Sequence, residues 1–217
     1  MYNVKHYLCH SIMAGRLNQN ALMGEITMKV SREQAAENRG KILQAAAQLF
    51  REKGFDGIGI ADLMKKVGLT HGGFYGHFAS KEDLMSQACD YAVDELLELG
   101  QVNNPASAKE GNRYKTFITR YLSGEHRDNP GQGCLMAALG ADAARQTPQV
   151  KQAFTQSFNR LLNALIQLLP LTKTPAARRE QAILTMATLV GAQVMARAVD
   201  DPVLSQEILK VVQKNLH

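Results

Sequence analysis

Residues 59–78 hold two short apolar segments on either side of Gly68, and this stretch constrains the fold more than any other part of the chain. A glycine just after the last apolar residue of a helix ends that helix, because glycine adopts the left-handed conformation without strain. Thr70 is a favoured N-cap, so a second helix is expected to begin there and to run to Phe78. One apolar seam serves both helices and consists of Leu63, Val67, Leu69, Phe74 and Phe78. The pattern predicts a helix-turn-helix, in which the seam fixes the angle between the two helices.

The second of these helices carries Gly72, Gly73 and Gly76. Each glycine inside a helix costs roughly 1 kcal/mol relative to alanine, so stability alone does not account for them. Glycine does allow another surface to approach the backbone, and the N-terminus of an exposed helix presents N–H groups to phosphates. The surrounding side chains that can donate hydrogen bonds to phosphate oxygens or base edges are Thr70, His71, Tyr75, His77 and Lys81. The segment is typical of a helix that enters a groove of DNA.

The remainder of the chain has the spacing of amphipathic helices separated by turn-rich stretches. A first helix is expected from Ser31, which has capping-box spacing to Gln34, up to the residue before Gly54. A short helix is expected from Ile60 to Val67. Further helices are expected at 80–99, 112–125, 134–146, 148–169, 175–199 and 203–216. No segment alternates apolar and polar residues as a half-buried strand does, so the sequence predicts an all-α fold.

Composition argues against several classes of protein. A hydrophobic content of 45% over 217 residues supports a packed core rather than disorder. The cysteines Cys9, Cys89 and Cys134 are odd in number and far apart, which indicates no disulfide framework and predicts a cytoplasmic protein. No run approaches about 20 apolar residues, and the N-terminus lacks a signal-peptide pattern, so neither membrane insertion nor secretion is expected. The net charge of +5 is spread over the chain and is weak support for DNA binding by itself.

The sequence offers no pattern of catalytic chemistry. It contains no Ser-His-Asp arrangement, no phosphate-binding glycine loop after a strand and no metal-ligand spacing, so we expect no catalytic residues, no cofactor and no metal site. His71 and His77 lie six positions apart on a short helix without a nearby cysteine, which favours DNA contact over metal binding. For Tyr75, the alternative to a DNA contact is simple partial burial.

Residues 38–85 resemble the DNA-binding part of TetR-type (TetR/AcrR-like) transcriptional repressors. The run from Gly68 to Leu84 is similar to the family signature, in which a recognition helix with a Tyr-x-x-Phe element precedes a Ser-Lys-Glu helix start. The segment from Ile42 to Phe55 is similar to the family's first helix. We therefore interpret the predicted helix-turn-helix through this resemblance.

The resemblance implies a division of the chain and a function. Residues 31–79 are expected to form a three-helix DNA-binding domain with the helix-turn-helix at 59–78, and 80–217 a helical ligand-binding and dimerisation domain. Residues 1–30 are expected to be a flexible arm or an extension, with Met28 as an alternative natural start. The implied protein is a homodimeric repressor of double-stranded operator DNA that releases the operator when a small-molecule inducer binds.

The resemblance also implies roles for single residues. The implied phosphate contacts are Thr70, Tyr75 and Lys81, and the residues nearest the bases are His71, Gly73 and His77, with Gly72 in the same DNA-binding turn. Gly59 is a departure, because the family usually has Ser or Thr there as an N-cap and phosphate contact. Glycine can still cap a helix, but the hydroxyl contact is lost.

Cys134 is a candidate redox or ligand sensor. It follows a Gly-Gln-Gly turn at 131–133 and begins a helix, whose N-terminal dipole favours a thiolate. Repressors with a similar regulatory domain sometimes use such a cysteine to sense electrophiles or oxidants, so the alternative function is a thiol-based repressor switched at Cys134. Against this, the residues at 135–139 are apolar, and a free cysteine is usually a small buried hydrophobe. Cys89 is expected to lie in the core.

The last two long helices are expected to form the dimer interface, with an intrachain seam as the alternative. The small and apolar residues chosen for this face are Ile183, Met186, Val190, Gly191, Ala192, Val194, Ala196 and Ala198, with Val203, Leu204, Ile208, Val211 and Val212. Other apolar residues either line an inducer pocket or fill the core, and these are Met136, Phe154, Phe158, Met186 and Met195.

Overall fold

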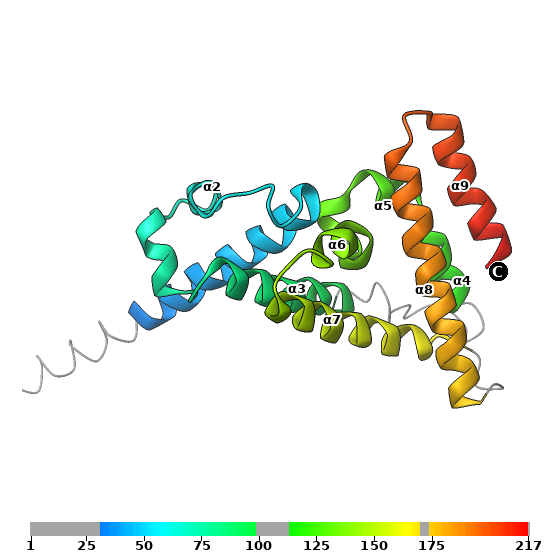
Figure 1. Cartoon of the computed structure of the whole chain (residues 1–217), viewed down its shortest axis with the longest axis horizontal. Helices are drawn as coiled ribbons and strands as arrows, with labels where there is room; N and C mark the ends of the chain where they lie inside the picture. The colour runs from blue at the N-terminus through cyan, green and yellow to red at the C-terminus, as the bar shows by residue number, and fades with distance from the viewer. Residues whose placement is uncertain (1–30, 99–112, 170–173, 217) are drawn as a thin grey trace, which may run out of the picture. The chain divides into compact units, whose positions relative to one another are not determined.

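The computed structural model describes residues 31–98, 113–169 and 174–216, in which the regular structure is helical and no strand occurs (Figure 1). The prediction of an all-α fold is confirmed. The predicted arm at 1–30 lies outside the described residues, and so does Leu99, the expected end of one helix. No helix of the described ranges is long and apolar enough to cross a membrane.

The chain falls into two compact units, residues 1–41 and 42–217. Of the first unit, residues 31–41 are described and are helical from Ser31 onward. Gln34 Nε2 donates to Glu37 Oε2 and to Asn38 Oδ1 at 3.2 Å each, and the capping role expected for Ser31 and Gln34 stays a prediction.

The second unit contains the rest of the first helix, which extends to residue 53, and all later elements (Figure 1). The later elements are α2 (Ile60–Lys66), η1 (His71–Gly76), α3 (Lys81–Glu98), α4 (Arg113–Tyr121), α5 (Gly124–Asp128), η3 (Pro130–Gln132), α6 (Leu135–Ala143), α7 (Pro148–Ile166), α8 (Pro175–Ala198) and α9 (Pro202–Asn215). Gly54 and Gly68 have φ angles of 79° and 74°, which confirms that left-handed glycines end the first helix and α2.

The helix predicted at 112–125 is divided into α4 and α5. Ser123 separates them in an extended conformation, and its Oγ accepts a hydrogen bond of 3.1 Å from the backbone N–H of His126. A serine that caps a new helix competes with continuation of the preceding one. The division matters because α5 carries His126, a residue of the cavity described below.

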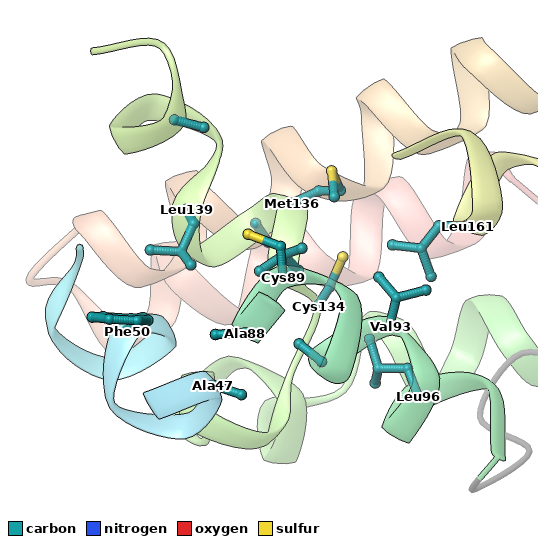
Figure 2. Packing of buried hydrophobic residues seen from close by; sticks show 14 of the residues in the cluster. Ala47, Phe50, Ala88, Cys89, Val93, Leu96, Cys134, Met136, Leu139 and Leu161 are labelled. Carbon is teal, nitrogen blue, oxygen red and sulfur yellow. The ribbon is translucent and has the colours of Figure 1, made fainter. Parts of the chain in front are cut away.

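One continuous core joins the helices of the second unit. α3 packs along α7, and α8 packs against both α7 and α9. Figure 2 shows Ala47 and Phe50 of the first helix near Ala88 of α3, in the same cluster as Leu139 of α6. Cys89 is buried in this cluster, and burial raises the pKa of its thiol to about 12, which confirms the prediction that it belongs to the core.

Candidate nucleic-acid interface and a cavity beside the first helix

The helix-turn-helix is held by a buried apolar seam. Leu63, Phe74 and Phe78 are at most 2% exposed, and the rings of Phe74 and Phe78 stack at 5.6 Å. Met64, which sequence reasoning did not select, is fully buried and accepts a hydrogen bond of 2.9 Å from the backbone N–H of Leu69. The seam fixes how η1 sits on α2.

The recognition segment is a 3₁₀ helix over His71–Gly76 rather than an α-helix reaching Phe78. Thr70 occupies the N-cap position as predicted, but its side chain forms no capping hydrogen bond. The backbone N–H of Gly73 donates to Thr70 O at 3.0 Å, which is the three-residue spacing of a 3₁₀ helix. The three glycines explain the difference, because each loses much backbone freedom in a longer α-helix.

The chain itself does not require glycine in this turn. None of Gly72, Gly73 and Gly76 has a positive φ. A Cβ at Gly72 or Gly76 would have no heavy atom within 4 Å, and one at Gly73 would lie 3.4 Å from Thr70 Oγ1. The backbone is therefore open to an outside surface at these positions.

The predicted DNA-binding residues lie together on one exposed turn. Those classed as exposed are Thr70, His71, Gly72, Gly73 and Tyr75, while His77 and Lys81 are partly exposed. Tyr75 is 62% exposed, which argues against simple burial, and its ring meets His71 edge-on at 6.2 Å. A role of these residues in DNA contact stays a prediction.

Lys81 is positioned by a capping box that sequence reasoning only partly described. Ser80 Oγ accepts from the backbone N–H of Asp83 at 3.1 Å, and Asp83 Oδ2 accepts from the backbone N–H of Ala79 at 3.0 Å. These two bonds form a variant of the capping box, in which the carboxylate reaches the residue before the N-cap, and they begin α3 directly after the recognition turn. Lys81 is thereby fixed at the first position of α3.

Arg51 links three segments and was not selected from the sequence. It is 4% exposed and donates to Ala47 O at 3.1 Å, to Gly133 O at 3.2 Å and to Glu95 Oε2 at 2.9 Å. Its guanidinium therefore ties the first helix to α3 and to the segment that precedes α6.

A cavity of about 630 Å³ opens beside the first helix. Buried apolar side chains form part of its wall, namely Leu96, Leu161 and Met186 with the partly buried Phe117. Polar side chains form the rest, and they include Gln48, Glu52, Arg120, Glu125, Asp128 and Gln132. The wall thus combines the first helix, α3, α4, α5 and η3 in one site of the size that takes small molecules.

His126 and Tyr121 form a buried polar centre at this wall. His126 Nε2 accepts from the backbone N–H of Cys134 at 2.9 Å, so Nδ1 carries the proton and donates to Tyr121 O at 2.6 Å. Burial lowers the pKa of His126 to about 4, which leaves the ring neutral at pH 7. Burial also raises the pKa of Tyr121 well above its usual value, with the nearby Cys134 thiol adding to the effect. No hydrogen bond of ordinary geometry reaches Tyr121 Oη from the described residues.

Cys134 lines the cavity, as a sensor would have to, but it is only 6% exposed. It occupies the N-cap position of α6, which agrees with the predicted helix start. Figure 2 shows its sulfur among apolar neighbours that include Val93 and Leu161. Burial on this scale limits access of a reagent to the thiol.

The other apolar residues proposed from the sequence lie in different environments in the structure. Met186 lines the cavity, whereas Met136 lies in the core. Phe154 and Phe158 are partly buried against that core. Met195 is 52% exposed, so its assignment to a pocket or core is wrong.

The predicted dimer face divides into a buried and an exposed part. Met186, Ala192 and Ala196 are at most 4% exposed in the single chain, so placing them on the outer face is wrong. They pack inward because α8 also packs against α6, α7 and α9 (Figure 1). The large apolar side chains that do remain exposed on these two helices are Ile183, Leu184, Val194, Met195, Val203, Leu204 and Val211.

Comparison with known proteins agrees with the fold and the motif. The family described as "Bacterial regulatory proteins, tetR family" matches residues 42–88. The HTH-type transcriptional regulator AcrR of Shigella flexneri is 32% identical over 69 residues, which are 32% of this chain and 32% of that protein. The uncharacterized HTH-type transcriptional regulator YerO of Bacillus subtilis is 24% identical over 119 residues, covering 54% of this chain and 40% of that protein. The matches therefore span less than half of these relatives.

Solved structures extend the likeness beyond the motif. The reduced form of E. coli NemR has a TM-score of 0.68 at 20% identity and covers 83% of this chain and 95% of its own. A TetR-family regulator from Agrobacterium tumefaciens has a TM-score of 0.67 at 24% identity and covers 83% of this chain and 98% of its own. These structures show the same fold over the C-terminal helices. Residues 42–88 therefore match the DNA-binding part of the TetR family of bacterial regulatory proteins, and the described helices have the fold of solved TetR-family regulators.

Proposed function

We propose that this regulator is a repressor that binds double-stranded operator DNA through η1 and releases it when a small molecule occupies the cavity. The observation that carries the proposal is the exposed turn at His71–Gly76, whose glycines serve no need of the chain itself. Backbone that is open at Gly72 and Gly76 suits close approach to a DNA groove. We assign residues 31–79 to DNA binding, 80–217 to regulation and dimerisation, and 1–30 to a flexible arm or extension.

The residues of the turn divide by the part of DNA that each can reach. Thr70, Tyr75 and Lys81 would donate to phosphate oxygens, which sets the position of the protein on the duplex. His71 and His77 would read base edges, with Gly72 and Gly73 allowing the approach. The N-cap residue of α2 is Gly59, which has no hydroxyl group. This protein would therefore make one phosphate contact fewer than relatives with a hydroxyl there.

A homodimer is the second part of the proposal. Seven large apolar side chains stay exposed on α8 and α9, and together they make an unusually apolar pair of helix faces. Pairing these faces across a two-fold axis would cover them and set two η1 turns apart. Two turns reach successive major grooves when they are roughly 34–36 Å apart.

The signal would pass from the cavity to η1 through contacts of the first helix and α6. Arg51 bonds Gly133 O beside the start of α6. At the other end of α6, a Cβ at Gly54 would lie 2.4 Å from Asp142 Oδ2, and Gln146 donates to Asp56 at 3.3 Å. A ligand that displaces α6 would therefore shift the segment before the helix-turn-helix at two points of contact, at Arg51 and at residues 54–56.

Alanine at Gly76 tests the DNA-binding proposal. The added methyl group meets nothing within the chain, so Gly76→Ala should fold normally. If the turn approaches DNA closely, affinity for an operator selected from random duplexes should fall by about 10-fold, as expected for one lost contact. Gly140→Ala in α6, where a Cβ has only Phe154 at 4.0 Å, is the matched control and should bind normally. Equal DNA affinity of Gly76→Ala and wild type would contradict the assignment of η1.

A thiol switch at Cys134 is the second candidate function, favoured by the position of this cysteine in the cavity wall and at the N-cap of α6. Operator affinity would be measured for wild type and Cys134→Ser before and after treatment with N-ethylmaleimide. A thiol switch predicts that only the wild type releases DNA. An equal response of both proteins would leave a reversible ligand as the signal.

A further inference from the structure

We propose that the cavity takes a small organic cation with an apolar body, and that Glu52 of the first helix binds the charged group of this ligand. The inference rests on the proposed function, because it names the ligand class of the same cavity. It is carried by the charges of the wall, by the fixed position of Glu52 and by the apolar side of the site.

The wall of the cavity has more acidic than basic side chains. Its carboxylates are Glu52, Glu125 and Asp128, and its strongly basic side chain is Arg120. Asp128 is already paired with Arg127 at 2.7 Å. Among the described residues, no Lys or Arg side chain forms an ion pair with the carboxylate of Glu52 or of Glu125. A cation would therefore meet carboxylates that have no basic partner.

Glu52 is the better placed of these carboxylates. Gln48, one helical turn earlier, donates its amide to Glu52 Oε1 at 2.7 Å. A Cβ at Gly131 would lie 2.4 Å from the same oxygen, so the carboxylate rests against the backbone of η3. A glycine at 131 is what allows this approach. The Glu52 side chain is exposed, but this hydrogen bond and the contact with Gly131 orient its carboxylate before any ligand arrives, which lowers the entropy cost of binding.

The rest of the wall suits an apolar body. Phe117 and Tyr121 present aromatic rings 5.8 Å apart, and Leu161 and Met186 add aliphatic surface. Aromatic rings attract cations as well as apolar groups. No hydrogen bond of ordinary geometry reaches the buried Tyr121 Oη from the described residues, so this group in the cavity wall can pair with a polar atom of a ligand.

The position of Glu52 gives the ligand a direct contact with the DNA-binding part of the chain. Glu52 follows Arg51, whose guanidinium bonds Gly133 O and Glu95. A cation bound between Glu52 and the apolar wall would hold the first helix against α4 and η3. A ligand bound in this way would act on the first helix directly and not only through α3.

Three probes that share one body separate charge from shape. These are 4-phenylbutylammonium, 4-phenylbutan-1-ol and 4-phenylbutanoate, each titrated calorimetrically into the full-length protein at pH 7. We expect the ammonium probe to bind about 3- to 5-fold more tightly than the alcohol, since Glu52 is exposed and an ion pair in contact with water contributes at most about 1 kcal/mol. Glu52→Gln, which keeps the shape of the side chain, should remove that advantage. Glu98→Gln, which removes an exposed charge outside the cavity wall, should leave it unchanged.

Several results would overturn the cation assignment. Equal binding of ammonium and alcohol, retained preference in Glu52→Gln, or no binding of any probe would each refute it. Tightest binding of the carboxylate, lost in Arg120→Gln, would mean that the cavity takes an anion instead. The proposed function is tested separately by operator affinity: ammonium binding through Glu52 that leaves operator affinity unchanged would support the site and refute its role in release.

Discussion

Replacing Arg51 by methionine removes a buried cation and keeps a side chain of similar length. Arg51 makes hydrogen bonds of 3.1, 3.2 and 2.9 Å to Ala47 O, Gly133 O and Glu95 Oε2. Hydrogen bonds to a charged group contribute about 1.5–3 kcal/mol each, but the variant recovers several kcal/mol of desolvation cost. The Glu95 side chain is 30% exposed and returns to water easily. We therefore expect the free energy of unfolding to fall by about 2 kcal/mol.

Removing the partner of Arg51 should cost at least as much. Glu95→Gln leaves the guanidinium charged and 2% exposed, with two carbonyl acceptors. Losing one member of a fully buried ion pair costs about 3–5 kcal/mol, and the partial exposure of Glu95 reduces our expectation to about 2–3 kcal/mol. The double variant Arg51→Met/Glu95→Gln should lose less than the sum of the single variants, with a coupling energy of about 1 kcal/mol.

Urea unfolding at pH 7, followed by circular dichroism, measures these free energies. Lys53→Met is the control, because Lys53 is an exposed base in the same helix, and its effect should stay within about 0.5 kcal/mol. An unchanged unfolding free energy in Arg51→Met would refute the argument that this side chain joins the first helix to α3. Strict additivity in the double variant would show that the ion pair itself contributes nothing.

Lower pH should destabilise the protein through His126, whose pKa burial holds at about 4 against an ordinary 6.5. The unfolded state therefore binds a proton at a higher pH than the folded state does. The free energy of unfolding consequently decreases as the pH falls from about 6.5 to 4. His126→Gln should show a shallower fall in unfolding free energy over that window, measured by urea titration at each pH. Tyr121→Phe removes a buried hydroxyl that no hydrogen bond of ordinary geometry reaches from the described residues, so the melting temperature of the ligand-free protein should rise by the equivalent of about 1 kcal/mol, and a decrease would indicate that the contact with Cys134 is a hydrogen bond. Val194→Glu puts a charge on the exposed face of α8 and should halve the mass measured by light scattering; an unchanged mass would remove this face from the dimer interface.

Local signals made the helix-turn-helix predictable from the sequence. Gly54 and Gly68 end their helices with positive φ, and this property depends on the glycine itself rather than on distant contacts. The conformation of η1 was less predictable, because Thr70 favours the start of a helix while the glycines that follow destabilise an α-helix. The outcome is the shorter 3₁₀ helix, in which Phe74 is buried.

The cavity and its polar centre depend on contacts that sequence patterns do not reveal. Arg51 reads as an ordinary exposed base of an amphipathic helix, yet it bonds Gly133, 82 positions later. His126 lies in a stretch that reads as a turn, and its role depends on Cys134 and Tyr121 meeting it from two other segments. Cys134 could be found early, since its place after a glycine turn marks a helix start, and Met186 was a candidate for either a pocket or the core.

The construction of η1 explains how a signal can reach it without changing its own conformation. A 3₁₀ helix with glycines at 72, 73 and 76 has little internal rigidity, so its position depends on the groups at its ends. At the C-terminal end these groups are Phe78, whose ring stacks on that of Phe74, and Ser80, which caps α3. Phe78 belongs to the core shared with α3 and the first helix, and Ser80 caps α3, so a displacement of α3 or of the first helix would carry the recognition turn with it. A turn held in this way stays fixed to the core of its own protomer but can move relative to the turn of a second protomer. Binding to two successive major grooves depends on the distance between these two turns.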